Sequence, residues 1–185
     1  MVQVKKMKNK EKIILYIWLS SLIIIILVGV MMCFQRPSEK IIEANKEVLM
    51  LAGKIRTYYS NRPDYWGLGN SEVIKQKLYP GKINNNQIMN NLGKIVNIGS
   101  DGNGTPIMPG VHNFIISYQK LNQKECIELA SFHWSEEDRL GLISITIQNT
   151  KGSYEFSWGD KGLPLSKGMA KQYCKEENKL LWSFE

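Results

Sequence analysis

The side chains that most enzymes use for catalysis are scarce in this sequence. Its 185 residues include two histidines, His112 and His133, and three cysteines. None of the patterns G-x-S-x-G, H-E-x-x-H or a glycine-rich phosphate loop occurs. Neither histidine stands at a metal-site spacing from a cysteine, which argues against a zinc site. These absences predict a protein that is not an enzyme and that uses no metal or other cofactor.

Basic charge is concentrated at one end of the chain. The net charge is +7 and the isoelectric point is about 9.2, values that would also fit a nucleic-acid-binding protein. Five lysines lie within the first twelve residues, however, and the remainder has no basic stripe with interleaved aromatic residues. We therefore expect no nucleic-acid partner.

Three features look like ligand sites but lack the necessary pattern. The segment Gly99–Gly104 has the composition of a calcium loop but neither its spacing nor its closing glutamate. The acidic run Glu136–Asp138 is typical of a solvated loop. We expect Trp134, Trp158 and Trp182 to be core or interface residues rather than stacking platforms for a ligand.

One long hydrophobic run follows the basic N-terminus. Residues 13–34 carry no charge and would span about 33 Å as a helix, which is enough to cross a bilayer. The lysines of residues 1–12 predict that this tail stays in the cytoplasm and that the remainder is exported. A cleaved signal peptide is the alternative, but its apolar core is usually shorter and is followed by small residues. We expect the helix to contact lipid and other helices through Ile13, Ile17, Leu22, Ile26, Val30 and Phe34.

An amphipathic helix is predicted across residues 35–62. Apolar residues recur there at spacings of three and four, namely Ile41, Ala44, Val48, Leu51, Ala52, Ile55 and Tyr59. The other side carries Glu43, Lys46, Glu47, Lys54 and Arg56. We expect the apolar side to rest on a folded domain and the charged side to face solvent. Pro63 ends the helix, and residues 63–185 are predicted to form the exported domain.

Residues 63–185 have the pattern of an α+β domain. Short helices are expected at 70–78 with Asn70 or Ser71 as the cap, at 124–132 with Asn122 as the cap, and at 166–175. Strands are expected at 94–98, 112–118, 140–148, 154–158 and 179–184, the third and fourth as a hairpin. The asparagine-rich segment 80–91 is predicted to be an irregular loop that could hide a strand turn.

The three cysteines differ in their surroundings. Cys33 stands at the end of the hydrophobic run and is expected to be an inert thiol, whereas Cys126 and Cys174 fall in the exported part. Export favours a disulfide between these two, which would close a loop of about 49 residues and stabilise the domain by roughly 4 kcal/mol. Two buried free thiols are the alternative.

The order and spacing of these elements resemble the type IVb pilins, bundlin most closely. The resemblance runs over nearly the whole chain, and after the basic leader it is carried by residues Ile41–Tyr59, Tyr65–Leu68, Asn90–Ile98, Phe114–Tyr118, Lys124–Ala130, Gly141–Ile147 and Ala170–Lys175. It implies a long N-terminal helix packed on an antiparallel sheet. It also implies that the Cys126–Cys174 bridge bounds a variable region exposed on a pilus.

The chain departs from this family at the leader. Family members are cut after a glycine that ends the leader, and most carry glutamate at the fifth residue of the mature chain. Here Lys12 and Ile17 occupy those two positions. An uncut chain would leave that glutamate as a lone carboxylate in lipid, and its leader lysines could not cross the apolar core of a filament cheaply.

These departures lead to a hypothesis about function. We expect a non-enzymatic accessory component of a type IVb pilus or related secretion system, held in the inner membrane of a bacterium with its domain in the periplasm. Its partners would be pilin subunits or pilus assembly proteins, together with membrane lipid. A processed chain would instead enter the pilus. The alternative is a periplasmic ligand-binding or regulatory protein with a single membrane span, although so short a tail cannot form a cytoplasmic output domain.

Overall fold

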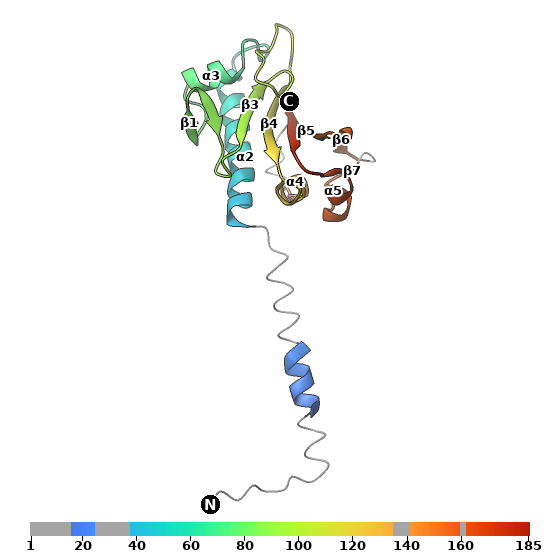
Figure 1. The fold of residues 1–185 in the computed structure, drawn as a ribbon. Coiled ribbons are helices and arrows are strands. Elements are labelled where there is room, and N and C mark those ends of the chain that lie inside the picture. Colours follow the sequence, from blue (N-terminus) through green and yellow to red (C-terminus); the bar gives the residue numbers. More distant parts are fainter. Residues whose placement is uncertain (1–15, 25–37, 135–140, 160–161) are drawn as a thin grey trace, which may run out of the picture. The chain divides into compact units, whose positions relative to one another are not determined.

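A computed structural model of the chain describes residues 16–24, 38–134, 141–159 and 162–185. The chain divides into two units, Met1–Pro37 and Ser38–Glu185 (Figure 1). In the first unit, residues 16–24 form a helix. The described residues of the second unit form four helices and an eight-stranded sheet. The predictions for Ile13, Ile26, Val30, Cys33 and Phe34 lie outside the described residues.

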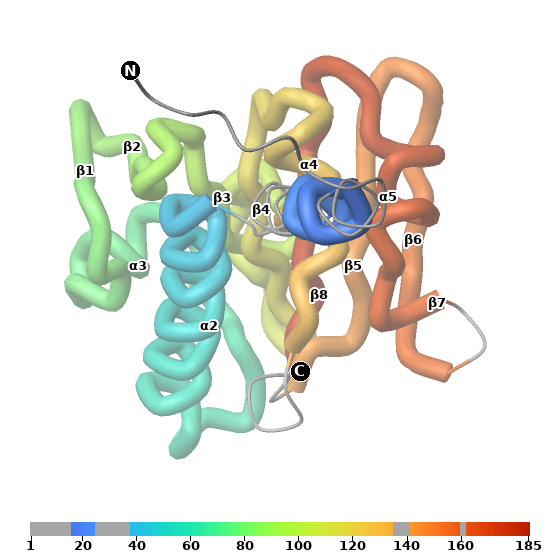
Figure 2. The backbone as a smooth tube through the Cα atoms, turned by 90° about the horizontal axis from the view of Figure 1, so that it is seen from below, coloured from blue at the N-terminus to red at the C-terminus, as the bar shows by residue number. Residues whose placement is uncertain are grey.

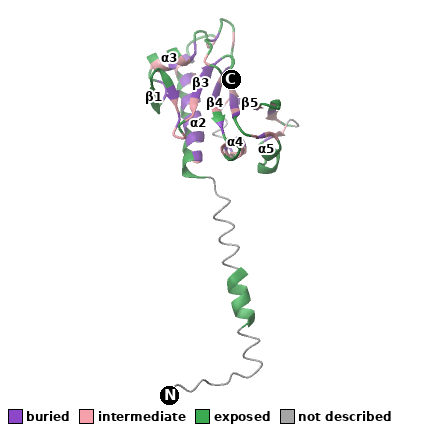
Figure 3. Ribbon diagram, viewed as in Figure 1, coloured by how far each residue is buried: buried purple, intermediate pink, exposed green. Residues whose placement is uncertain are grey.

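Helix α2 (Glu39–Tyr59) is the long helix of the second unit. Glu39 lies in its first turn and Arg56 in its last. Each side chain carries a charge opposite in sign to the nearer end of the helix dipole, which stabilises the helix. All seven apolar residues that the helical spacing singled out are buried. Figure 3 shows this buried stripe along α2. The apolar stripe therefore makes α2 a wall of the domain core.

The sheet has the order β1-β2-β3-β4-β8-β5-β6-β7. Its strands are β1 (Lys82–Asn84), β2 (Gln87–Met89), β3 (Ile95–Gly99), β4 (Phe114–Leu121), β5 (Leu142–Asn149), β6 (Gly152–Trp158), β7 (Gly162–Leu163) and β8 (Asn178–Phe184). Every pairing is antiparallel except that of β6 with β7. The C-terminal strand β8 lies between β4 and β5, so it joins the two halves of the sheet.

One face of the sheet packs against α2. Leu180, Trp182 and Phe184 alternate along β8 and are fully buried. Trp182 meets the ring of Tyr118 edge-to-face with centroids 4.9 Å apart. The hydroxyl of Tyr118 donates a hydrogen bond of 2.8 Å to the carbonyl of Ala44 on α2. Helix and sheet are thus joined by a buried polar contact as well as by apolar packing.

Three short helices complete the domain (Figure 2). They are α3 (Asn70–Lys75), α4 (Gln123–Ala130) and α5 (Lys167–Tyr173). At α4, Asn122 Oδ1 accepts from the N–H of Glu125 and Glu125 Oε2 accepts from the N–H of Asn122, which is a complete capping box. Ser166 caps α5 through the N–H of Met169.

The structure confirms the predicted α+β class, with an N-terminal helix, a mainly antiparallel sheet and one disulfide. One local prediction was wrong, and one segment left open by the sequence is now defined. Helix α3 begins after Gly69 with no side-chain cap, because the side chain of Asn70 bonds instead to Asn97 and to the N–H of Ile98. The segment 80–91, expected to be an irregular loop that could hide a strand turn, does contain such a turn, the β1–β2 hairpin, whose turn residues Asn85 and Asn86 both have positive φ.

Candidate interaction surfaces

The helix of residues 16–24 is apolar on every side. Each of its residues is exposed within its own unit, including Ile17 and Leu22 from the predicted set (Figure 3). The hydroxyls of its two serines are hydrogen-bonded within the helix, because Ser20 Oγ donates to the carbonyl of Ile17 and Ser21 Oγ to that of Trp18. A surface of this kind suits hydrocarbon or another apolar helix. Within the described residues, no helix has both the length and the apolar character needed to cross a membrane.

A second candidate surface lies beside the disulfide, at the end of the domain that contains α4 and α5. Cys126 on α4 and Cys174 at the C-terminal end of α5 are bonded, with their Cα atoms 5.8 Å apart, and both are fully buried. Beside them, Gln123 Nε2 donates to the carbonyl of Cys174, and Asn149 Nδ2 to that of Tyr173. The bridge therefore fastens the short helix α5 onto α4. Most of α5 remains exposed for contacts with another protein.

A third surface comprises two exposed apolar side chains, Trp66 and Met108. They are 63% and 70% exposed, respectively, and lie on neighbouring loops. The loops are fastened together by hydrogen bonds from the N–H of Gly67 to the carbonyl of Ile107 and from the N–H of Ile107 to that of Leu68. An exposed tryptophan on a rigid loop is typical of a protein contact. Trp66 belongs to the stretch Tyr65–Leu68 that carries the family resemblance, but its exposure could not be predicted, because one exposed aromatic residue leaves no periodic signal.

Asp64 organises the base of these loops. Its Oδ2 accepts from the N–H of Gly110 at 2.6 Å and its Oδ1 from the N–H of Trp66 at 3.1 Å. The Gly110 hydrogen bond, followed by that of Trp66, holds the pKa of Asp64 below its usual value, and the nearby His112 adds to this. Asp64 therefore serves as a structural anion that positions Trp66.

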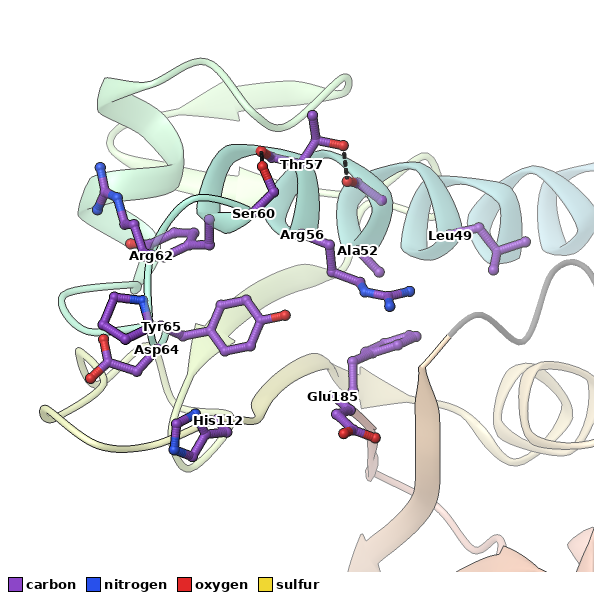
Figure 4. Close-up of a pocket in the computed structure, with 14 residues that line it drawn as sticks. Leu49, Ala52, Arg56, Thr57, Ser60, Arg62, Asp64, Tyr65, His112 and Glu185 are labelled. Carbon is purple, nitrogen blue, oxygen red and sulfur yellow. Dashed lines mark hydrogen bonds between the residues drawn. The ribbon is translucent and has the colours of Figure 1, made fainter.

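A pocket of about 700 Å³ lies between α2, the loop after it and the chain end (Figure 4). Its polar groups are mostly engaged within the chain. Thr57 and Ser60 donate their hydroxyls to helix carbonyls, while Arg62 lies over the rings of Tyr58 and Tyr59. Burial raises the pKa of Tyr59 to about 12, so this ring is neutral at physiological pH.

The same pocket contains no nucleophile activated by a base. Figure 4 shows His112 at its edge, beside Asp64, with Ser60 across the cavity just after the C-terminal end of α2. In the part of the chain that the structure describes, His112 makes no hydrogen bond to a hydroxyl or thiol. Acyl transfer by a serine–histidine pair has no support in this geometry. His133, the second histidine, is exposed just after α4.

The segment that resembled a calcium loop is held by its own hydrogen bonds. Asp101 accepts from the N–H and the side chain of Asn103 and from the hydroxyl of Thr105. Gly102 lies over the outer face of the sheet, where its carbonyl accepts from the hydroxyl of Ser117. The described residues form no group of three or more metal-binding side chains. The acidic run Glu136–Asp138 lies outside them.

The three tryptophans singled out in the sequence differ in exposure. Trp134 and Trp182 are buried in the core. Trp158 is half-buried, and its indole N–H donates to the carbonyl of Leu142. None of the three forms an exposed stacking platform.

The prediction for the side chain of Glu47 was wrong. Its place among charged residues predicted a solvent-facing side chain, but it is only 7% exposed. It lies at the border between the apolar stripe and the charged side of α2, where packing by the β2–β3 turn covers it. Helical periodicity alone could not show this, because the covering residues come from a distant part of the sequence.

Comparison with known proteins agrees with this architecture. The family model for bundlin matches residues 37–182. Among solved structures, the crystal structure of TcpA, a type IV pilin from Vibrio cholerae El Tor biotype, matches with a TM-score of 0.53. The two are 12% identical over 80% of this chain and 100% of that one, so this likeness concerns the fold. No curated protein matches the chain. The family match covers most of the sequence, and the chain therefore belongs to the bundlin family of type IVb pilins, structural components of type IV pili.

Proposed function

We propose that this protein is an accessory pilin that stays anchored in the inner membrane instead of joining the filament as a main subunit. Residues 1–12 would remain in the cytoplasm, residues 13–34 would span the membrane, and the remainder would lie in the periplasm. The protein would contact pilin subunits or assembly proteins through its helices and its domain. It would do so without catalysing a reaction.

The observation that carries the proposal is the chemistry at the junction of the leader and the hydrophobic run. Lys12 stands at the position of the glycine after which pilin leaders are cut, and Ile17 at that of the usual glutamate. Ile17 lies on an exposed, uncharged helical surface. An uncleaved chain has no new amine for a glutamate to neutralise, so an apolar residue at this position is consistent with retention in lipid.

The five lysines of the leader supply the second argument. A retained leader keeps these charges next to the membrane surface, where they interact with anionic lipid. Moving them into an apolar filament core would cost several kcal/mol at least, on the order of 3 kcal/mol for each charge. Assembly into a fibre and retention of the leader therefore oppose each other.

The intact mass of protein purified from its native membrane tests the proposal. We expect the full-length chain with one disulfide, read from alkylation with and without reductant. A K12G/I17E variant serves as the matched control, because it restores both family residues and is expected to lose residues 1–12. Loss of these residues from the wild type would overturn the proposal and indicate a processed pilin. Cleavage after the hydrophobic run would indicate a signal peptide.

A further inference from the structure

The loop between β3 and β4 brings an amide to an amine of the C-terminal strand. Lys179 lies on β8 and points to the outer face of the sheet, and its Nζ donates a hydrogen bond of 2.6 Å to Asn103 Oδ1. Lys179 is half-buried, and Gly102 of the loop packs against Leu181, the next outward-facing residue of β8. The two partners are 76 positions apart in the sequence. Their contact therefore depends on the folded domain.

Asp101 holds the same amide at its nitrogen. Its Oδ2 accepts from Asn103 Nδ2 at 3.2 Å and from the hydroxyl of Thr105 at 2.8 Å, and its Oδ1 accepts from the N–H of Asn103 at 2.8 Å. Burial raises the pKa of Asp101, but the hydrogen bonds from Asn103 and Thr105 outweigh it and hold the pKa below the usual 3.8. The amide of Asn103 thus has an amine at its oxygen and an ionised carboxylate at its nitrogen.

The amine of Lys179 has surroundings that favour its neutral form. In the part of the chain that the structure describes, Lys179 forms no ion pair. Burial lowers the pKa of Lys179 below the usual 10.5, although the charge of Asp101 acts in the opposite direction. A lysine with a lowered pKa presents more of the uncharged amine, which is the nucleophilic form.

The amine also lies within reach of the amide carbon. A C=O bond is about 1.2 Å long, so the Nζ of Lys179 is at most about 3.8 Å from the Cγ of Asn103. Reacting atoms held at about 3–3.5 Å are in a near-attack arrangement. The hydrogen bond directs the amine at the oxygen, and rotation about the Cβ–Cγ bond of Asn103, a torsion with a broad range, turns the carbon toward it.

We propose that Lys179, Asn103 and Asp101 form a self-modification site, at which the lysine amine displaces ammonia from the asparagine and forms an isopeptide bond. The Nζ–Cγ bond forms, the Cγ–Nδ2 bond breaks, and one proton passes from Nζ to Nδ2. Both nitrogens are bonded to one carbon in the tetrahedral intermediate, so the carboxylate of Asp101, which already contacts Nδ2, can carry this proton between them. Asn103 is exposed, and the ammonia can diffuse away.

The product is a covalent link between the β3–β4 loop and β8. It needs no oxidant, reductant or second substrate, and unlike the disulfide it persists under reducing conditions. The link forms within the domain and does not depend on the membrane anchoring proposed above.

The intact mass of the reduced and alkylated full-length protein tests the proposal, after incubation of the folded protein in detergent at about pH 9 to increase the neutral amine. We expect a mass lower than that of the sequence by one ammonia, and one branched peptide containing Asn103 and Lys179 after proteolysis. The K179R variant keeps the charge and the donor but has no nucleophilic amine, so it should retain the sequence mass. An unchanged wild-type mass would overturn the proposal. Loss of residues 1–12 is a much larger change, so the same spectrum reports on leader cleavage separately.

A second route to loss of ammonia must be distinguished from this one. The backbone nitrogen of Gly104 could attack the same carbon of Asn103 and form a cyclic imide. That reaction needs neither Lys179 nor the fold, so it would also occur in K179R and in wild type kept unfolded in urea. We expect no loss of ammonia in either sample, and an equal loss in K179R and the wild type would overturn the proposal.

The D101N variant tests the role of the carboxylate. An amide at this position cannot carry the proton, so the branched peptide should form more slowly, on the order of a hundredfold. An equal rate in D101N and the wild type would overturn the role assigned to Asp101.

Discussion

Removal of the disulfide should have the largest effect on stability of the changes considered. Cys126 and Cys174 are 48 positions apart, so the bond restricts a long loop of the unfolded chain. The chain-entropy model gives about 4 kcal/mol for a loop of this length. A domain of this size is typically stable by about 5–15 kcal/mol. The double variant C126A/C174A should therefore lose between about a quarter and about four-fifths of that stability.

The structure also indicates that the loss of the bridge will destabilise helix α5 first. Helix α5 has seven residues and only Ala170 of them is buried, so it cannot persist by its own packing. Without the bridge, it is held by the hydrogen bonds from Gln123 and Asn149 to the carbonyls at its end and by the ring contacts of Tyr173. Amide exchange in α5 should rise before exchange in the central strand β8.

Urea unfolding of the full-length protein in detergent, followed by tryptophan fluorescence, measures the magnitude. With a slope of about 2 kcal/mol per molar urea, a loss of 4 kcal/mol lowers the midpoint by about 2 M. The variant C33A is the matched control and should unfold like the wild type. A shift below about 0.5 M in C126A/C174A would refute the reasoning, because the bridge would then not restrict the unfolded chain as the entropy model requires.

Three further predictions concern single side chains. The variant N122A removes one half of the capping box with Glu125 and should cost about 1 kcal/mol in urea unfolding, whereas no loss would mean that water replaces the cap. The variant Y118F removes the hydrogen bond to Ala44 and should also cost about 1 kcal/mol, measured in the same way; an unchanged midpoint would contradict the role assigned to this hydroxyl. The pKa of Asp64 is depressed below 3.8, so its contribution is present above that value and is lost as the pH falls through the folded pKa. Melting temperatures measured from about pH 5 to about pH 3 should therefore fall more steeply in the wild type than in D64N, and parallel curves would refute this.

Local patterns in the sequence predicted most of the secondary structure. Apolar spacings of three and four placed α2, and the strand expected at 140–148 is found as β5. Asn122 was recognised as a cap because the preference for asparagine at that position is a local effect. Such signals depend on residues within one or two turns of each other. They can be read without knowledge of the partner element.

The features that the sequence left open or predicted wrongly share a cause. The β1–β2 hairpin depends on positive φ at Asn85 and Asn86, and neither residue belongs to a hydrophobic pattern. Strand β7 has two residues and is defined only by its pairing with β6. The burial of Glu47 depends on Asn91 and Tyr79, which are more than thirty positions away. Each feature is decided by contacts that a short stretch of sequence does not contain.

The sequence by itself determined the kind of protein: an apolar run, an amphipathic helix, an α+β domain with a cysteine pair, and the resemblance that the bundlin match confirms. Only the tertiary structure decided that β8 lies between β4 and β5, that Glu47 is buried and that Trp66 is exposed. The physical reason is that periodicity reports which side of an element avoids water, while the identity of its neighbours follows from non-local packing.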